Sequence, residues 1–96
     1  MIFTEKIKQL REQLDLPQRK VAEALNIDSA TYCKIERGER KAKKEQLPIL
    51  AQFLKGDLDE LKTLWLADKM KNVAAGETEI IAAKAVEIVS NQYKKD

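Results

Sequence analysis

The side chains best suited to chemistry in this sequence are cations gathered between residues 34 and 44. Six of these residues are Lys or Arg and only two are Glu. Because the whole chain has a net charge of only +2, the segment is a local concentration of positive charge that suits phosphate groups. The cations are Lys34, Arg37, Arg40, Lys41, Lys43 and Lys44. Such a charge run is also typical of a solvated loop that binds nothing.

Side chains for catalysis, metal binding or redox switching are scarce. The chain has no histidine, and its one cysteine, Cys33, has no second thiol to pair with. The sequence contains neither a glycine-rich phosphate loop nor a nucleophile beside a base. We therefore expect no enzyme activity, no metal and no cofactor. We interpret Cys33 as a small side chain rather than a redox switch.

Length and composition favour one small domain in a reducing compartment. A chain of 96 residues can close one hydrophobic core but not two. The lone cysteine, together with an N-terminus that lacks the apolar segment of a signal peptide, favours a cytoplasmic location. No apolar run approaches the roughly 20 residues that cross a bilayer, so we expect no membrane partner.

Apolar residues recur at helical spacing along the whole chain, and no segment alternates as a strand does. The pattern predicts six helices, over about residues 4–14, 17–24, 29–36, 47–54, 58–74 and from 78 onward. Thr4, Asp28, Asp57 and Thr78 are placed to cap four of them. We expect residues 1–56 to form one body. Residues 57–96 should form C-terminal helices that pack on it.

A short helix, a tight turn and a second short helix occupy residues 17–38, which read PQRKVAEALNIDSATYCKIERG. Asn26 can adopt a left-handed conformation in the turn, and Ile27 can point back into the core. With its small Ala22 and its closing Glu-Arg-Gly, the segment resembles the Xre or Cro/cI phage-repressor family of helix-turn-helix proteins. The resemblance covers about residues 3–54. It implies an all-α, five-helix lambda-repressor-like DNA-binding domain, here with an extended fifth helix and an additional sixth helix.

The resemblance also implies roles for individual side chains. The helix over 29–36 would enter the major groove of double-stranded DNA with its N-terminal part foremost. The base-edge contacts would come from Ser29, Ala30 and Lys34, with Asp28 and Cys33 close enough to take part. The phosphate contacts would come from Gln18, Thr31, Arg37, Lys41, Lys43 and Lys44. Because Ser29 and Ala30 are short, Lys34 is the best candidate for a guanine contact, and groove shape should carry much of the specificity.

Other residues of the motif are interpreted as structural. The resemblance implies that Arg11 and Glu36 form a partly buried ion pair that ties the first helix to the third. Tyr32 shares an inward stripe with Ile35, so we place it in the core rather than against a base.

The two C-terminal helices carry more apolar surface than a small domain needs. Our hypothesis is that they form a homodimer, which would place two recognition helices one DNA turn, about 34 Å, apart on an inverted repeat. The candidate interface residues are Trp65, Leu66, Met70, Ile81, Ala85 and Ile88. The alternative is that the last helix only covers the core of its own chain.

The function predicted from these features is a sequence-specific transcriptional regulator. A repressor, possibly of its own operon, is favoured over an activator because a dimer in the groove blocks polymerase without contacting it. One alternative is the antitoxin of a toxin-antitoxin pair, whose C-terminal helices would hold a protein partner. Another is the controller protein of a restriction-modification system. The chain has no room for a separate ligand domain, which argues against a small-molecule effector, and a pocket between the two C-terminal helices is the alternative.

Overall fold

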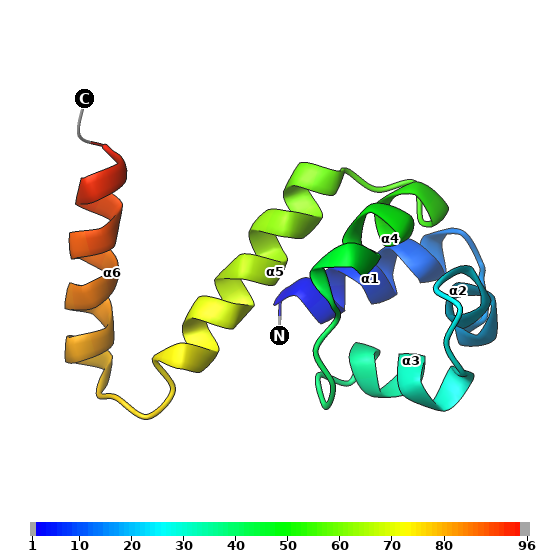
Figure 1. Cartoon of the computed structure of the whole chain (residues 1–96), viewed down its shortest axis with the longest axis horizontal. Helices are drawn as coiled ribbons and strands as arrows, with labels where there is room; N and C mark the ends of the chain where they lie inside the picture. Colours follow the sequence, from blue (N-terminus) through cyan, green and yellow to red (C-terminus); the bar gives the residue numbers. More distant parts are fainter. Residues whose placement is uncertain (1, 95–96) are drawn as a thin grey trace.

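The computed structural model describes residues 2–94, which form six α-helices and no strand (Figure 1). The six predicted helices are thereby confirmed, with ends within two residues of those expected. Pro17 precedes the second helix as its N-cap residue instead of being its first residue. The elements are α1 (Ile2–Gln13), α2 (Gln18–Ala24), α3 (Ser29–Glu36), the 3-10 turn η1 (Lys44–Gln46), α4 (Leu47–Phe53), α5 (Leu58–Val73) and α6 (Glu79–Tyr93).

Three of the four predicted caps form hydrogen bonds that define where their helices begin, whereas Thr4 lies inside α1, which begins at Ile2. Asp28 Oδ1 accepts from the Thr31 backbone N–H at 2.6 Å before α3. Asp57 begins α5 and Thr78 begins α6 in the same way, each at 3.3 Å. These bonds satisfy backbone donors that have no partner inside the helix, so the local sequence fixes the helix starts.

One hydrophobic core lies between α1, α2, α3, α4 and the first half of α5. Its fully buried side chains include Ile7, Tyr32, Leu50 and Leu61. Leu61 belongs to α5, so the first half of α5 contributes to this core. Within the described residues, no helix combines the length and apolar composition that a bilayer crossing needs.

The N-terminus of α1 is capped by a residue far away in sequence. The Asp68 carboxylate, from α5, accepts hydrogen bonds from the backbone N–H groups of Ile2 at 3.3 Å and Phe3 at 2.9 Å. Asp68 is buried, with 7% of its surface exposed. The negative carboxylate also faces the positive end of the helix dipole, so this contact fastens α5 to α1.

The last helix stands apart from the body on the far side of α5 (Figure 1). None of its residues is buried, and Ile80 and Ile88 are 69% and 63% exposed. Our expectation that both C-terminal helices pack on the body is therefore wrong for α6, and so is the alternative that it covers the core. The reason is that α5 runs past the body before the chain turns at residues 74–78.

Candidate nucleic-acid interface

The turn between α2 and α3 sets the angle at which α3 leaves the body. Asn26 adopts the predicted left-handed conformation, with φ of 57°. The Ile27 N–H then donates to the Ala22 carbonyl at 3.0 Å, and the Ile27 side chain packs against the core. Gly38 follows the other end of α3 with φ of 78°, a conformation that glycine adopts without steric cost. The two short helices are thus fixed to each other by local backbone bonds.

The two faces of α3 meet different surroundings. Tyr32 and Ile35 are fully buried on the inner face. Ser29, Ala30 and Lys34 are exposed on the outer face, as a base-reading surface requires. Cys33 and Thr31 are half-buried at its margins. The structure therefore places these predicted contact residues on or beside one exposed face.

Asp28 is exposed but already engaged as the cap of α3. Its bond from Thr31 lowers the pKa of the Asp28 carboxyl, and the positive charges of Lys34 and Arg40 lower that pKa further. The carboxylate is therefore ionised and can accept hydrogen bonds only. Beside DNA it suits a cytosine amino group and opposes a phosphate.

Gln18, Arg11 and Glu36 form one hydrogen-bonded cluster beneath α2 and α3. The Arg11 guanidinium donates to both Glu36 oxygens, at 2.7 and 3.1 Å, and to the Leu16 carbonyl at 2.8 Å. The predicted ion pair is therefore present. The Gln18 side-chain amide donates to Glu36 Oε1 at 3.1 Å. One of its two N–H groups is thus directed inward, away from the place where we expected a phosphate.

Glu36 is the acidic centre of this cluster, and it makes the fold sensitive to acid. Burial alone would raise the pKa of Glu36, but hydrogen bonds from Arg11 and Gln18 lower it below the ordinary 4.5. The bonds from Arg11 also raise the pKa of the guanidinium itself. A carboxyl whose pKa is lower in the folded state stabilises the protein above its ordinary pKa. It loses this effect as the pH falls through the folded value.

We expect the stability advantage of the wild type over the Glu36→Gln variant to be constant above pH 4.5 and to shrink below it. The measurement is the free energy of unfolding in urea, followed by circular dichroism across this range. Asp59→Asn, which changes an exposed carboxyl, is the control for general charge effects. An advantage that does not change on acidification would contradict the assignment.

The Tyr32 hydroxyl lies deep in the same region. Its oxygen is buried and has no hydrogen-bond partner of good geometry within residues 2–94, although it is near enough to Glu36 for each to affect the pKa of the other. Burial raises the pKa of Tyr32 far above its usual range, so the phenol stays neutral. Tyr32 is a core residue, as predicted, and it does not reach the exposed face.

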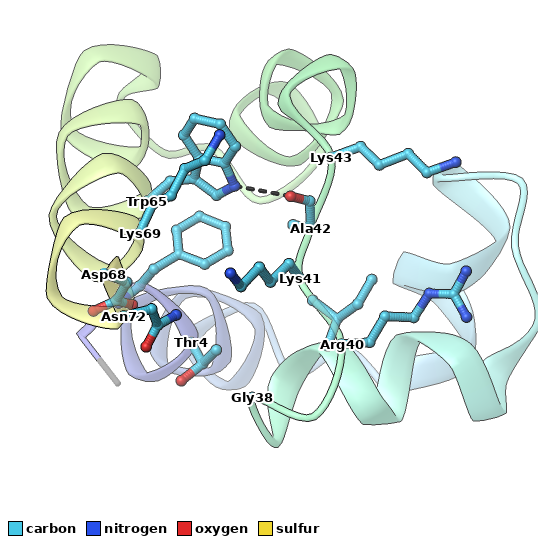
Figure 2. Close-up of a pocket in the computed structure, with 12 residues that line it drawn as sticks. Thr4, Gly38, Arg40, Lys41, Ala42, Lys43, Trp65, Asp68, Lys69 and Asn72 are labelled. Carbon is cyan, nitrogen blue, oxygen red and sulfur yellow. Dashed lines mark hydrogen bonds between the residues drawn. The ribbon is translucent and has the colours of Figure 1, made fainter. Parts of the chain in front are cut away.

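The basic loop after α3 divides its cations between two directions. Arg40 and Lys43 extend to one side, whereas Lys41 points the opposite way, towards Asp68 and Lys69 of α5 (Figure 2). Our prediction grouped Lys41 with Lys43 as a phosphate contact, and the structure does not bring their amines together. Arg37 is exposed and pairs with Glu39 at 2.8 Å, which partly neutralises it.

Arg40 was absent from our predicted contacts, although it belongs to the basic run. Its backbone N–H donates to the Lys34 carbonyl at 3.2 Å, which holds the loop against the C-terminal end of α3. Its positive charge lowers the pKa of Asp28, the cap of α3. Arg40 is exposed, and its side chain extends beside α3 (Figure 2). The only sequence signal for this was its place within the run of cations.

Trp65 does not belong with the other predicted interface residues. Its indole N–H donates to the Ala42 carbonyl at 2.8 Å, and the ring packs against the core of its own chain (Figure 2). The remaining candidates, by contrast, are exposed. They are Leu66, Met70, Ile81, Ala85 and Ile88.

Comparison with known proteins supports this description of the fold. The helix-turn-helix family model HTH_3 matches residues 7–61, which include α2, the turn and α3. Comparisons with curated proteins and with solved structures find no match. Among the described residues, no group of three or more His, Cys, Asp or Glu side chains could hold a metal ion. With more than half of its length matched, the chain belongs to the Cro/cI/Xre-type helix-turn-helix family of DNA-binding regulators.

Proposed function

We propose that the protein is a homodimeric, sequence-specific repressor that reads an inverted-repeat operator with α3 in the major groove. The observation that carries the proposal is the two-sided character of α3. Tyr32 and Ile35 bury its inner face in the core, and Ser29, Ala30 and Lys34 are exposed on its outer face. A short, rigidly held helix with one open face fits the groove of B-form DNA.

The side chains of that face suit modest direct readout. Ser29 and Ala30 can offer a single hydrogen bond or a contact to a thymine methyl group, and Lys34 can donate to guanine. Arg40, Lys43 and Lys44 are exposed cations that follow α3 in the chain and suit the phosphate backbone. Affinity should therefore depend strongly on phosphate contacts. Specificity should depend on a few base pairs and on groove shape.

The exposed apolar residues of α6 support the dimer. Ile81, Ala85 and Ile88 recur at helical spacing on one face, and Val86 and Val89 widen it. Leu66, Met70 and Val73 form a second exposed stripe on α5, with Val73 83% exposed. Apolar surface of this extent is rare on a monomer and typical of a protein interface. A second copy of the chain would bring two α3 helices to one DNA duplex.

The test is fluorescence anisotropy on DNA selected by the protein, with scrambled DNA and a salt titration alongside. We expect selection of an inverted repeat whose half-sites lie one helical turn apart or a multiple of it. The double variant Lys43→Ala/Lys44→Ala should reduce the slope of log affinity against log salt by about 0.9 for each phosphate that the variant no longer neutralises. Lys62→Ala, an exposed cation on α5, should leave the slope unchanged.

Equal, weak binding to selected and scrambled DNA would contradict the proposed reader. In that case the apolar face of α6 would favour the antitoxin alternative, in which a different protein covers it. A stoichiometric complex with that protein, assembled by a chain that sediments as a monomer when alone, would be the supporting result.

A further inference from the structure

A cavity of about 210 Å³ lies between the basic loop and α5, apart from the exposed face of α3 (Figure 2). Its apolar walls come from α1, α3, the loop and α5, and Trp65 forms one of them. The apolar wall residues are Phe3, Ile35, Ala42 and Trp65. The indole bond to the Ala42 carbonyl fixes one corner of the cavity.

Positive charge surrounds the mouth of this cavity. Lys41 points into it from the loop, and Lys69 Nζ lies 5.0 Å from the centre of the Trp65 ring (Figure 2). Neither lysine forms an ion pair with any described residue. Among the described residues that line the cavity, Asp68 is the only acid, and its oxygens already accept bonds from Ile2 and Phe3. Lys41 and Lys69 thus outnumber the one carboxylate, so the cavity has an apolar floor and a net positive charge at its rim.

We propose that this cavity binds a small aromatic carboxylate. A cavity of about 150 Å³ lined by apolar side chains is enough to hold benzene, so the volume here has room for one ring and a short acid. The ring would lie against Trp65 and Phe3. The carboxylate would face Lys41 and Lys69, which offer charge-assisted hydrogen bonds in a partly desolvated place.

A ligand bound in this cavity would also weaken DNA binding, an inference that rests on the proposed function. Arg40 and Lys43 also line the cavity, next to Lys41 and Ala42 in the same loop, and their side chains extend to the other side of the loop (Figure 2). A bound anion would cancel the charge of Lys41 beside these cations and so weaken attraction to phosphate. By thermodynamic linkage, DNA would weaken ligand binding by the same factor.

The test uses the full chain and phenylacetate, with phenylacetamide as the neutral comparison. Trp65 is the only tryptophan, so its fluorescence reports on the cavity directly. We expect a saturable change with phenylacetate, with a dissociation constant on the order of 1 mM or tighter. Lys41→Gln should weaken binding about tenfold. Lys44→Gln, which lies outside the cavity, should change it less than about twofold.

Two results would overturn the site. One is the absence of saturable fluorescence change and of ligand-detected NMR signals with phenylacetate. The other is equal binding of phenylacetamide that Lys41→Gln leaves unaltered, since this would mean an apolar hole without charge recognition. DNA binding is measured first without ligand, so failure of the proposed reader is seen separately. Ligand binding with no loss of DNA affinity would contradict the coupling.

Discussion

Arg11→Ala should lower the free energy of unfolding by about 3–5 kcal/mol, because it leaves the Glu36 carboxylate buried without its counter-ion. The side chains of this pair are only 12% and 3% exposed. Small domains have about 5–15 kcal/mol of stability in total, so the variant should be partly unfolded at physiological temperature. Chemical denaturation followed by circular dichroism measures the loss.

The size of this effect follows from what Arg11 contacts. Its guanidinium joins α1 to α3 through Glu36 and to the loop before α2 through the Leu16 carbonyl. Its removal leaves two acceptors with fewer donors in a place that water reaches poorly. Because the same cluster holds the start of α2 and the end of α3, DNA binding should fail together with stability.

The Lys6–Glu60 pair is the matched control. Its side chains are 28% and 48% exposed and their charged atoms are 3.2 Å apart. Lys6→Ala should cost no more than about 1 kcal/mol. The double replacement Arg11→Met/Glu36→Leu should regain much of the stability, since no charge is then left unpaired. A loss for Arg11→Ala no larger than that for Lys6→Ala would show that the pair has no special energetic role.

The sequence predicted the helix-turn-helix well because its signals are local. Asp28 is three residues from the N–H that it caps, and Asn26 takes its left-handed conformation from its own backbone preference. Such contacts do not depend on where the rest of the chain lies. The Arg11–Glu36 pair spans 25 residues, and only resemblance to a known family could predict it.

The features that were missed depend on long-range placement. Asp68 caps a helix 65 residues away, and nothing in its surrounding sequence marks it as a cap. The role of Gly56 also depends on a distant residue. The left-handed conformation after α4 is adopted by its neighbour Lys55, not by the glycine. A Cβ at Gly56 would lie 2.8 Å from Leu10 Cδ1, so the glycine permits close packing rather than a turn.

The charge or apolarity of a residue likewise does not reveal in which direction its side chain points in the folded chain. Lys41 and Lys43 look equivalent as letters, yet their amines extend to opposite sides of the loop (Figure 2). The apolar face of α6 predicts that something covers it, and hydrophobicity alone does not say whether this is the same chain. The second half of α5 runs past the body, so α6 lies apart from it and does not cover the core of its own chain (Figure 1).

Ile81→Asp/Ile88→Asp should convert the proposed dimer into a monomer and lower its affinity for the inverted repeat by about a hundredfold or more. Both isoleucines are more than half exposed in the single chain, at 53% and 63%, so the substitutions should leave the monomer folded. The loss arises because the second α3 would no longer bind at the high effective concentration that linkage provides. Affinity for an isolated half-site should change little.

Sedimentation and anisotropy together test this prediction, with Ala83→Asp as the matched control. Ala83 is exposed on the polar side of α6, beside Glu79 and Glu87, so one negative charge added there, against two in the double variant, should leave assembly and DNA binding intact. If the double variant remained a dimer, α6 would not be the interface. If the wild type were already a monomer that bound the inverted repeat no better than a half-site, the apolar face would have to serve a different partner.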